Sequence, residues 1–253
     1  MFTGLAILVL TIALVWGAYF LARWLLLRFV DDRTSELAGS VIFRVSALHG
    51  LILALVFAQE MIEYQELERG LTAEATAVAD IYYDIGRFGG DSVDPIQTAL
   101  TRYARTVVTE EWQSLTENKR LSSDAWQARE TVYEALLDLP ADTPRQASLR
   151  DHMLDKVRGI AEYRQARESH AASSINVMFW IAAVGGVVLV AFSFFCFPAR
   201  PVNLLLLTIF AAFTGIVMQV IYAFSDPFAP PGALQPTAFE RLLDGDIGSH
   251  RGG

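Results

Sequence analysis

The sequence predicts an all-α, polytopic membrane protein: four transmembrane helices, with an extramembrane helical bundle inserted between the second and the third. Four long segments are almost wholly apolar, and a stretch of about 18 such residues suffices to cross a hydrocarbon core. They are Phe2–Leu27, Val41–Phe57, Ile175–Phe197 and Val202–Phe224, and their only charged residues are Arg23 and Arg44. The second segment reaches the required length when Ala58–Ile62 is added. The polar stretch that follows repeats its apolar residues at helical spacing, and no strand-like alternation competes with it.

We expect Phe2–Leu27 to be a retained first helix rather than a signal peptide. No Lys or Arg precedes it, and it exceeds the apolar core of about 7–15 residues that a signal peptide carries. The composition excludes a soluble enzyme, a disordered chain and a secreted disulfide scaffold. The only cysteine, Cys196, lies within an apolar segment, so no intramolecular disulfide is expected.

The second segment is expected to continue beyond the membrane as one long helix, because no proline occurs between Val41 and Phe88. Its buried face beyond the membrane is predicted to carry Leu71, Ala75, Val78, Tyr82 and Ile85. Glycines 86, 89 and 90 should end it.

Three further helices are predicted in the insertion from their start signals. These signals are Asp94 before a proline, Ser122 or Ser123, and Thr143-Pro-Arg-Gln146. The corresponding apolar faces are Ile96, Leu100, Tyr103 and Val107; then Trp126, Tyr133 and Leu136; then Leu149, Met153, Val157 and Ile160. The last helix is expected to lead into the third span.

The expected divisions follow from these elements. Residues 1–62 hold transmembrane helices 1 and 2, and 63–174 the extramembrane bundle, which is continuous with helices 2 and 3. Residues 175–224 hold transmembrane helices 3 and 4. Residues 225–253 hold an interfacial turn, a short helix over Pro236–Leu243 and a frayed tail.

The charge distribution bears on partners and on orientation. Between Glu63 and Ser174 there are 20 acids and 13 bases, which accounts for most of the net charge of −8 and argues against nucleic acid as a partner. Arginines near the spans favour cytoplasmic short connections and an extracytoplasmic insertion. The short connections carry Arg23, Arg28, Arg33, Arg44 and Arg200, against Arg69, Arg164 and Arg167 on the other side.

No motif for an enzyme, a cofactor or a metal site is present. Phosphate-binding loops, nucleophile elbows and zinc-binding motifs are all missing from the sequence. The four histidines are too dispersed to suggest a metal cluster, and we interpret them as solvated or structural. The acidic pairs Asp31-Asp32 and Glu110-Glu111 are interpreted as solvated charges.

The second span carries the candidate functional residues. Leu48, Ile52, Leu55, Gln59 and Ile62 form a continuous stripe that fits a helix-packing seam or, in a ring of identical subunits, the lining of a pore. Arg44, Glu60 and Glu63 are candidates for the charged mouths of that pore, or for markers of the two membrane interfaces. His49 is the ionisable residue furthest inside the span. On the third span, Ala182 and Gly186 permit close helix approach.

Several strings resemble the bestrophin-like family of four-span membrane proteins. Residues 49–85 resemble the family signature, in which a GxxxxxLxF span leads into a helix with an EAxAIxxLYR-type motif. Glu74, Ala75, Ala77, Val78, Ile81 and Tyr82 occupy matching positions of that motif. Tyr103 and the following residues to Trp112 resemble the family's second helix, and Asp226-Pro-Phe228 resembles its ending. Asp84 departs from the pattern, since a basic residue is common there, and the turn after Phe228 is longer than usual.

The resemblance implies a four-span subunit related to the bestrophins, which assemble as pentameric anion channels gated along the second helix. Family proteins of this kind occur in bacteria, so the bacterial inner membrane is the expected location. Two observations oppose a direct transfer of the channel properties: the arginine bias turns the insertion outward, and its negative charge would concentrate cations.

Two function hypotheses remain open at this point. The first is a homo-oligomer in the lipid bilayer, pentameric by resemblance, that conducts inorganic ions along the second span. The second is a non-conducting membrane scaffold or sensor whose helical insertion binds a partner. A transporter is a more distant third, since no span is broken in mid-membrane.

Overall fold

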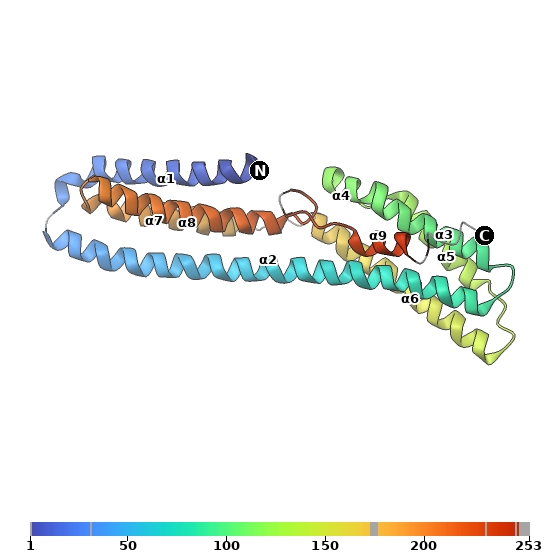
Figure 1. Ribbon diagram of the computed structural model, residues 1–253. Coiled ribbons are helices and arrows are strands. Elements are labelled where there is room, and N and C mark those ends of the chain that lie inside the picture. The colour runs from blue at the N-terminus through green and yellow to red at the C-terminus, as the bar shows by residue number, and fades with distance from the viewer. Residues whose placement is uncertain (1, 31, 173–176, 231, 246, 248–253) are drawn as a thin grey trace. The chain divides into compact units, whose positions relative to one another are not determined.

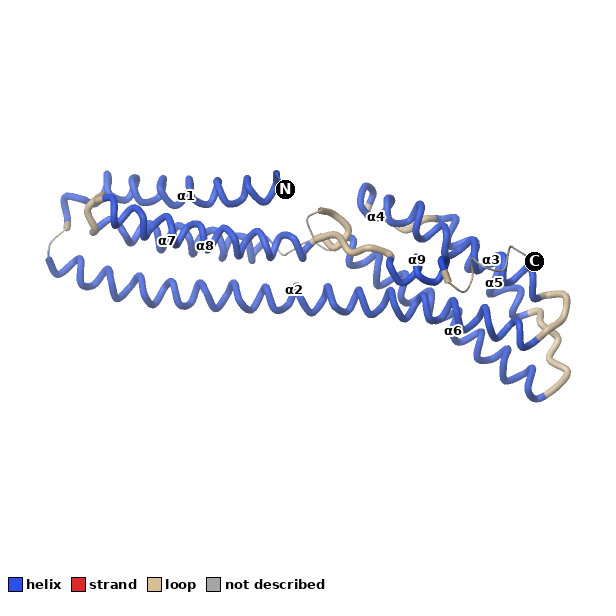
Figure 2. The backbone as a smooth tube through the Cα atoms, in the orientation of Figure 1, coloured by secondary structure: helices blue, strands red, loops and turns tan. Residues whose placement is uncertain are grey.

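The computed structural model describes residues 2–30, 32–172, 177–230, 232–245 and 247, and all regular secondary structure in these ranges is helical (Figures 1 and 2). The prediction of an all-α chain is therefore confirmed. Several predicted features lie outside the described residues: Asp31 of the first acidic pair, His250, the junction that leads into the third span, and the tail from 248 to 253. The same holds for the side chain of Arg33.

The chain forms nine α-helices over the described residues: α1 (Phe2–Leu26), α2 (Asp32–Phe88), α3 (Val93–Thr106), α4 (Trp112–Asn118), α5 (Ser123–Leu137), α6 (Pro144–Ala172), α7 (Val177–Ser193), α8 (Pro201–Ser225) and α9 (Thr237–Asp244). Two 3-10 turns, η1 (Leu27–Phe29) and η3 (Phe194–Cys196), and one π-helical turn, η2 (Val107–Glu111), complete the order.

Four helices are long and apolar enough to cross a membrane, as predicted. They cover Gly4–Leu26, Ser35–Phe88, Val177–Cys196 and Pro201–Ser225. The second of these belongs to α2, which is one uninterrupted helix of 57 residues. Gly89 and Gly90 follow it with φ of 78° and 90°, a left-handed conformation that glycine adopts without strain and that ends the helix.

The chain divides into two compact units, to which α2 contributes one part each. The first unit comprises residues 1–63, 174–226 and 230–232. Within it, α1 packs against α7 and α8, and α7 packs against α8. Leu53 of α2 joins their apolar core, which also contains Val15, Ala183 and Ala211.

Small residues bring the helices of the first unit close together. A Cβ atom added at Gly215 of α8 would lie 3.1 Å from Leu8 Cδ1 and 3.3 Å from Leu8 Cα on α1. A Cβ atom added at Gly186 of α7 would lie 2.2 Å from Nδ1 of His49 on α2. The close approach predicted for the small residues of the third span therefore occurs at Gly186.

The second unit comprises residues 64–173, 227–229 and 233–253, and it has its own hydrophobic core. In it α3 packs against α5 and α9, and α5 packs against α6. The four residues predicted for the buried face of α3 are all buried, as are Met153, Val157 and Ile160 of α6. The predicted face of α2 is also buried, at Leu71, Ala75, Val78, Tyr82 and Ile85.

The predicted start signals were right in two places and wrong in one. The Ser122 hydroxyl accepts a hydrogen bond from the Asp124 amide at 3.2 Å. Thr143 and Gln146 bond reciprocally, since the Gln146 amide donates to Thr143 Oγ1 and Thr143 N–H donates to Gln146 Oε1. Asp94, by contrast, is not the cap of α3, because the helix already begins at Val93.

The predicted apolar face of α5 needs one correction. Leu136 is fully buried and Tyr133 is partly buried, but Trp126 is 45% exposed. Its ring instead lies beside the guanidinium of Arg129, 5.2 Å from the ring centroid. Arg129 is itself buried and donates two hydrogen bonds to the Val157 carbonyl of α6.

Candidate functional site

The stripe predicted on the second span is exposed in the first unit. The exposed fractions are 62% for Leu48, 40% for Ile52, 63% for Leu55 and 51% for Ile62, and Gln59 is also exposed. Leu53 and His49 of the same helix are buried, so α2 has one face packed against its own unit and one face free. Such an exposed apolar face can contact lipid, or it can line a pore shared with other subunits.

The charged candidates lie toward the two ends of this stripe along the helix. Arg44 is exposed, and Glu60 and Glu63 are partly buried. Gln59 Nε2 donates a hydrogen bond of 2.7 Å to Glu63 Oε1, one helical turn further on. The carboxylate of Glu63 is thereby held beside the end of the stripe.

A buried charge cluster is the most concentrated polar feature of the second unit. Its members are Glu74 on α2, Glu111 at the end of η2, Arg164 and Arg167 on α6, and Tyr103 on α3. All five side chains are at most 1% exposed. The two arginines and two glutamates balance one another, so complementary charges replace water around each.

The contacts within the buried charge cluster form a continuous network. Arg167 donates to both carboxylate oxygens of Glu74, at 3.0 and 3.3 Å, and also to Glu111. Arg164 pairs with Glu111 at 2.9 Å, and Tyr103 donates its hydroxyl proton to Glu74. The second oxygen of Glu111 also accepts from the Ser122 amide, so the cluster reaches the start of α5.

Burial shifts the ionisation of the cluster. Desolvation raises the pKa of Glu74, and the Arg167 guanidinium and the Tyr103 hydroxyl oppose that rise only in part. Desolvation and the nearby Glu74 raise the pKa of Tyr103 well above its ordinary value. Burial alone would lower the pKa of Arg167, but the carboxylates of Glu74 and Glu111 outweigh it and raise that pKa. Arg167 is therefore a permanent cation.

Glu111 corrects the interpretation of the acidic pair Glu110-Glu111 as solvated. Glu110 is exposed, whereas Glu111 is fully buried in the buried charge cluster. The helical spacing in the sequence could have indicated that Glu111 is buried, because it lies four residues after buried Val107 and four before buried Leu115. Arg164 and Arg167 likewise continue the predicted face of α6 from Ile160 at spacings of four and three.

The other family-motif residues hold the C-terminal segment against the second unit. Trp112 Nε1 donates to the Leu234 carbonyl at 2.8 Å, and its ring meets that of Phe228 edge-on at 5.5 Å. The Phe228 carbonyl accepts from Thr116 at 2.8 Å, and the Pro227 carbonyl accepts from the Leu234 amide. Asp226 follows the last residue of α8. The Tyr82 carbonyl accepts from Gln97, which ties α2 to α3.

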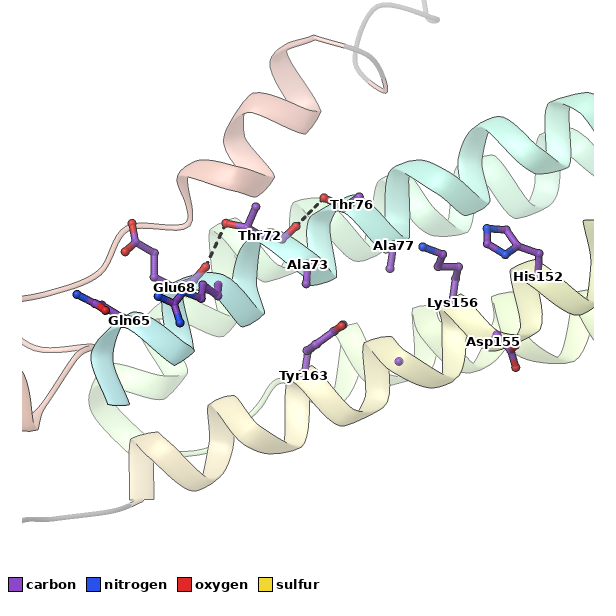
Figure 3. Close-up of a pocket in the computed structure, with 12 residues that line it drawn as sticks. Gln65, Glu68, Thr72, Ala73, Thr76, Ala77, His152, Asp155, Lys156 and Tyr163 are labelled. Carbon is purple, nitrogen blue, oxygen red and sulfur yellow. Dashed lines mark hydrogen bonds between the residues drawn. The ribbon is translucent and has the colours of Figure 1, made fainter. Parts of the chain in front are cut away.

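An open groove lies between α2 and α6 in the second unit (Figure 3). Ala73, Ala77 and Tyr163 line it, and charged side chains such as Glu68 and Asp155 stand along it. Two side-chain contacts link the helices beside the groove. Lys156 forms an ion pair with Asp80 at 2.7 Å, and His152 lies 3.8 Å from Asp84, with which it forms an ion pair only when protonated. Over the described ranges, no three histidine, cysteine or acidic residues gather as a metal site would require.

Comparison with known proteins identifies the fold family. The Bestrophin-like domain profile matches residues 9–239. Two point variants of a bacterial bestrophin homologue from Klebsiella pneumoniae have similar structures. Each is 12% identical to this chain; their TM-scores are 0.68 and 0.69, covering 95% and 94% of this chain and 99% and 97% of theirs.

No curated protein sequence matches the chain. At 12% identity the likeness to the solved structures concerns the fold alone. The family profile, in contrast, covers most of the sequence, and it confirms the resemblance first suggested by the second helix and the C-terminal motif. The chain therefore belongs to the bestrophin-like family and is a multi-pass membrane protein of that family.

Proposed function

We propose that this protein is the subunit of a homo-oligomeric ion channel whose pore is lined by the exposed stripe of α2. The single observation that carries the proposal is the free apolar face of this helix. In the most apolar stretch of α2 only 11% of residues are buried within the chain, against 22–33% in the other three candidate spans. A helix that packs so little within its own subunit is available to surround an axis shared with other copies.

The chemistry of the stripe suits a gated pore. Four of its five residues are aliphatic, and a ring of such side chains forms a constriction that closes by expelling water. Gln59 is its one polar member, and Glu63 follows directly with its carboxylate bound to that amide. Water and ions that pass the constriction would meet polar groups at this end.

The balance of charge favours cations as the permeant species. Glu60 and Glu63 lie at one end of the stripe, and the segment from Glu63 to Ser174 has seven more acids than bases. Several copies around an axis would repeat this charge and raise the local concentration of cations. No enzymatic chemistry is proposed.

We also infer that residues 63–174 form an extramembrane bundle on the extracytoplasmic side of a bacterial inner membrane. Two of the three arginines that opposed this orientation, Arg164 and Arg167, are buried in salt bridges and do not face lipid headgroups. Of the near-membrane arginines on that side, only Arg69 is exposed. The arginine bias toward cytoplasmic short connections is stronger once the buried residues are removed from the count.

Two measurements test the channel. Electron images of the protein in lipid nanodiscs, viewed down the membrane normal, should show a closed ring with an axial gap, and five-fold symmetry is expected from the family. In liposomes, Leu55→Ser should increase ion leak over the wild type, because a polar side chain keeps a constriction wet. Phe43→Ser, at an exposed position of the same helix about 120° round from Leu55 and therefore outside the stripe, is the matched control.

The outcomes separate the channel from its rival. A ring together with a leak specific to Leu55→Ser supports the pore. A monomer, or a dimer without an axial gap, contradicts it and favours the scaffold or sensor, in which the acidic bundle binds a partner. A lower folded yield for Leu55→Ser without added leak would identify the stripe as a packing seam.

A further inference from the structure

His49 is a buried titratable group for which the proposed pore has no use. The side chain lies on α2 within the apolar span and is only 4% exposed. Neither ring nitrogen has a hydrogen-bond partner among the described residues. An imidazole in this position gives up its hydrogen bonds to water and receives none in return.

The ring is held in this position by a glycine. Gly186 of α7 comes so close that a Cβ atom there would lie 2.2 Å from Nδ1 and 2.9 Å from Cε1 of His49. The contact between α2 and α7 at this level therefore consists of an imidazole against bare helix backbone. Space for water beside the ring is missing as long as the two helices stay together.

Among the described side chains of the first unit, the other charged groups do not compensate a proton on His49. α7 contains no ionisable residue. On α2 the nearest charged residues are Arg44 and Glu60, five and eleven residues away, about 8 and 16 Å along the axis. On α1, Tyr19 and Arg23 donate to carbonyls of the segment after α7.

Among the side chains that the structure describes, the remaining titratable groups of the unit lie at helix ends. They are Tyr222 near the end of α8, Cys196 in η3, and Arg28, Glu36, Glu63, Arg200 and Asp226 near or beyond the ends of the spans. The packed state thus accommodates the neutral ring alone. A charged ring requires an acceptor or water, and both require α2 and α7 to separate.

We propose that His49 is a proton-binding site that controls the packing of α2 against α7 and, through it, the conductance of the channel. Neutral His49 keeps the two helices together, and acidification separates them at Gly186. Because the stripe shares α2 with His49, a change in this contact alters how the stripe faces the axis. The conductance part of this inference rests on the proposed function, while the packing part does not.

The packing is tested without ion flux. The melting temperature of the detergent-extracted protein is measured at pH 7.5 and pH 5.5 for the wild type, His49→Leu and His152→Leu. All other titratable groups are common to the first two proteins, so their difference isolates His49. The wild type should lose more thermal stability on acidification than His49→Leu. His152→Leu removes a histidine of the second unit whose contact with Asp84 strengthens on protonation, so it should lose at least as much stability on acidification as the wild type.

Flux is tested in liposomes at the same two pH values. Wild-type flux should change about fivefold or more between them, a usual size for coupling between a ligand and a conformational change. His49→Leu should abolish that change. Gly186→Ala forces the ring aside at neutral pH, so its flux at pH 7.5 should move in the same direction as wild-type flux does on acidification.

The possible results distinguish this inference from the proposed function. Equal acid sensitivity of wild type and His49→Leu, in melting or in flux, overturns the proton site and leaves the channel intact. A difference in melting with no ion flux at either pH supports the proton site and contradicts the channel. If Gly186→Ala changes the flux at pH 7.5 in the direction opposite to the change that acidification causes in the wild type, the coupling between packing and conductance is overturned.

Discussion

At the residue scale, two adjacent glutamates differ completely in environment. Glu111 is buried and paired with two arginines, whereas Glu110 is exposed. We expect Glu111→Gln to lower the free energy of unfolding by about 3–5 kcal/mol, because it leaves a buried guanidinium without its counter-charge. Glu110→Gln should change it by less than about 0.5 kcal/mol. Denaturant unfolding of the two extracted variants measures both, and equal effects would contradict the buried charge cluster.

Tyr103 gives a prediction about pH. Its pKa is raised well above the ordinary value of about 10, so the neutral phenol is favoured in the folded protein. Its contribution to stability is fully present below that ordinary pKa and is lost as the pH rises toward the raised one. Below the pH of alkaline unfolding, the native ultraviolet titration of Tyr103→Phe should match that of the wild type. After unfolding, the wild type should show one more ionising phenol, and a native difference of one phenol would contradict this.

The charges of the buried cluster could have been located from the sequence, but only by treating charged residues like apolar ones. Glu74 lies three residues after Leu71 and four before Val78. Arg164 and Arg167 continue the spacing of Val157 and Ile160. The charge of these side chains suggested that they face solvent, while their spacing along the helices placed them on the buried faces. The phase was decisive because opposite charges on three segments meet and compensate one another.

At the element scale, the contact of α1 with α8 depends on Gly215. We expect Gly215→Ala to destabilise the first unit by about 1–3 kcal/mol, because its Cβ would press on the backbone and side chain of Leu8. Gly17→Ala on α1 is the control, since its Cβ meets nothing within 4 Å and alanine is the better helix former.

The retained fraction of folded protein after heating, measured by size-exclusion chromatography, compares the two variants. Gly215→Ala should lose its folded peak at a lower temperature than the wild type, and Gly17→Ala should not. A wild-type profile for Gly215→Ala would mean that α1 and α8 are not in close contact in the extracted protein.

Helix existence was predictable in this chain, while local helix geometry was not. Apolar length and periodicity were sufficient for α1, α2, α6 and α8, because burial and membrane insertion depend on those patterns directly. The π-helical turn η2 has no such pattern: it widens the helix for one turn at Val107–Glu111 without proline or glycine. The start of α3 was predicted two residues late for a similar reason, since a helix end is set by a few competing hydrogen bonds.

At the scale of the whole molecule, this fold is compatible with very different amino-acid sequences. The structural likeness extends over 95% of the chain at 12% identity. Apolar spans, helix phases and a few side-chain anchors suffice for such a fold, and many sequences meet those requirements. The ion selectivity of the proposed channel is different, because selectivity depends on individual charges near a permeation path, and it must be predicted for this chain from its own acids.

The acidic residues at the end of the stripe lead to a prediction about ion selectivity. In a gradient of an alkali halide, the wild-type reversal potential should lie on the cation side, because Glu60, Glu63 and the acidic segment after them attract cations. The double change Glu60→Gln with Glu63→Gln should shift it toward the halide side, and raised ionic strength should weaken the wild-type preference through screening. Glu134→Gln, which removes an exposed acid on α5, should leave the reversal potential close to that of the wild type. A halide preference in the wild type would mean that the charge at the end of α2 does not set selectivity, and the basic residue at the other end, Arg44, would then be the one to change.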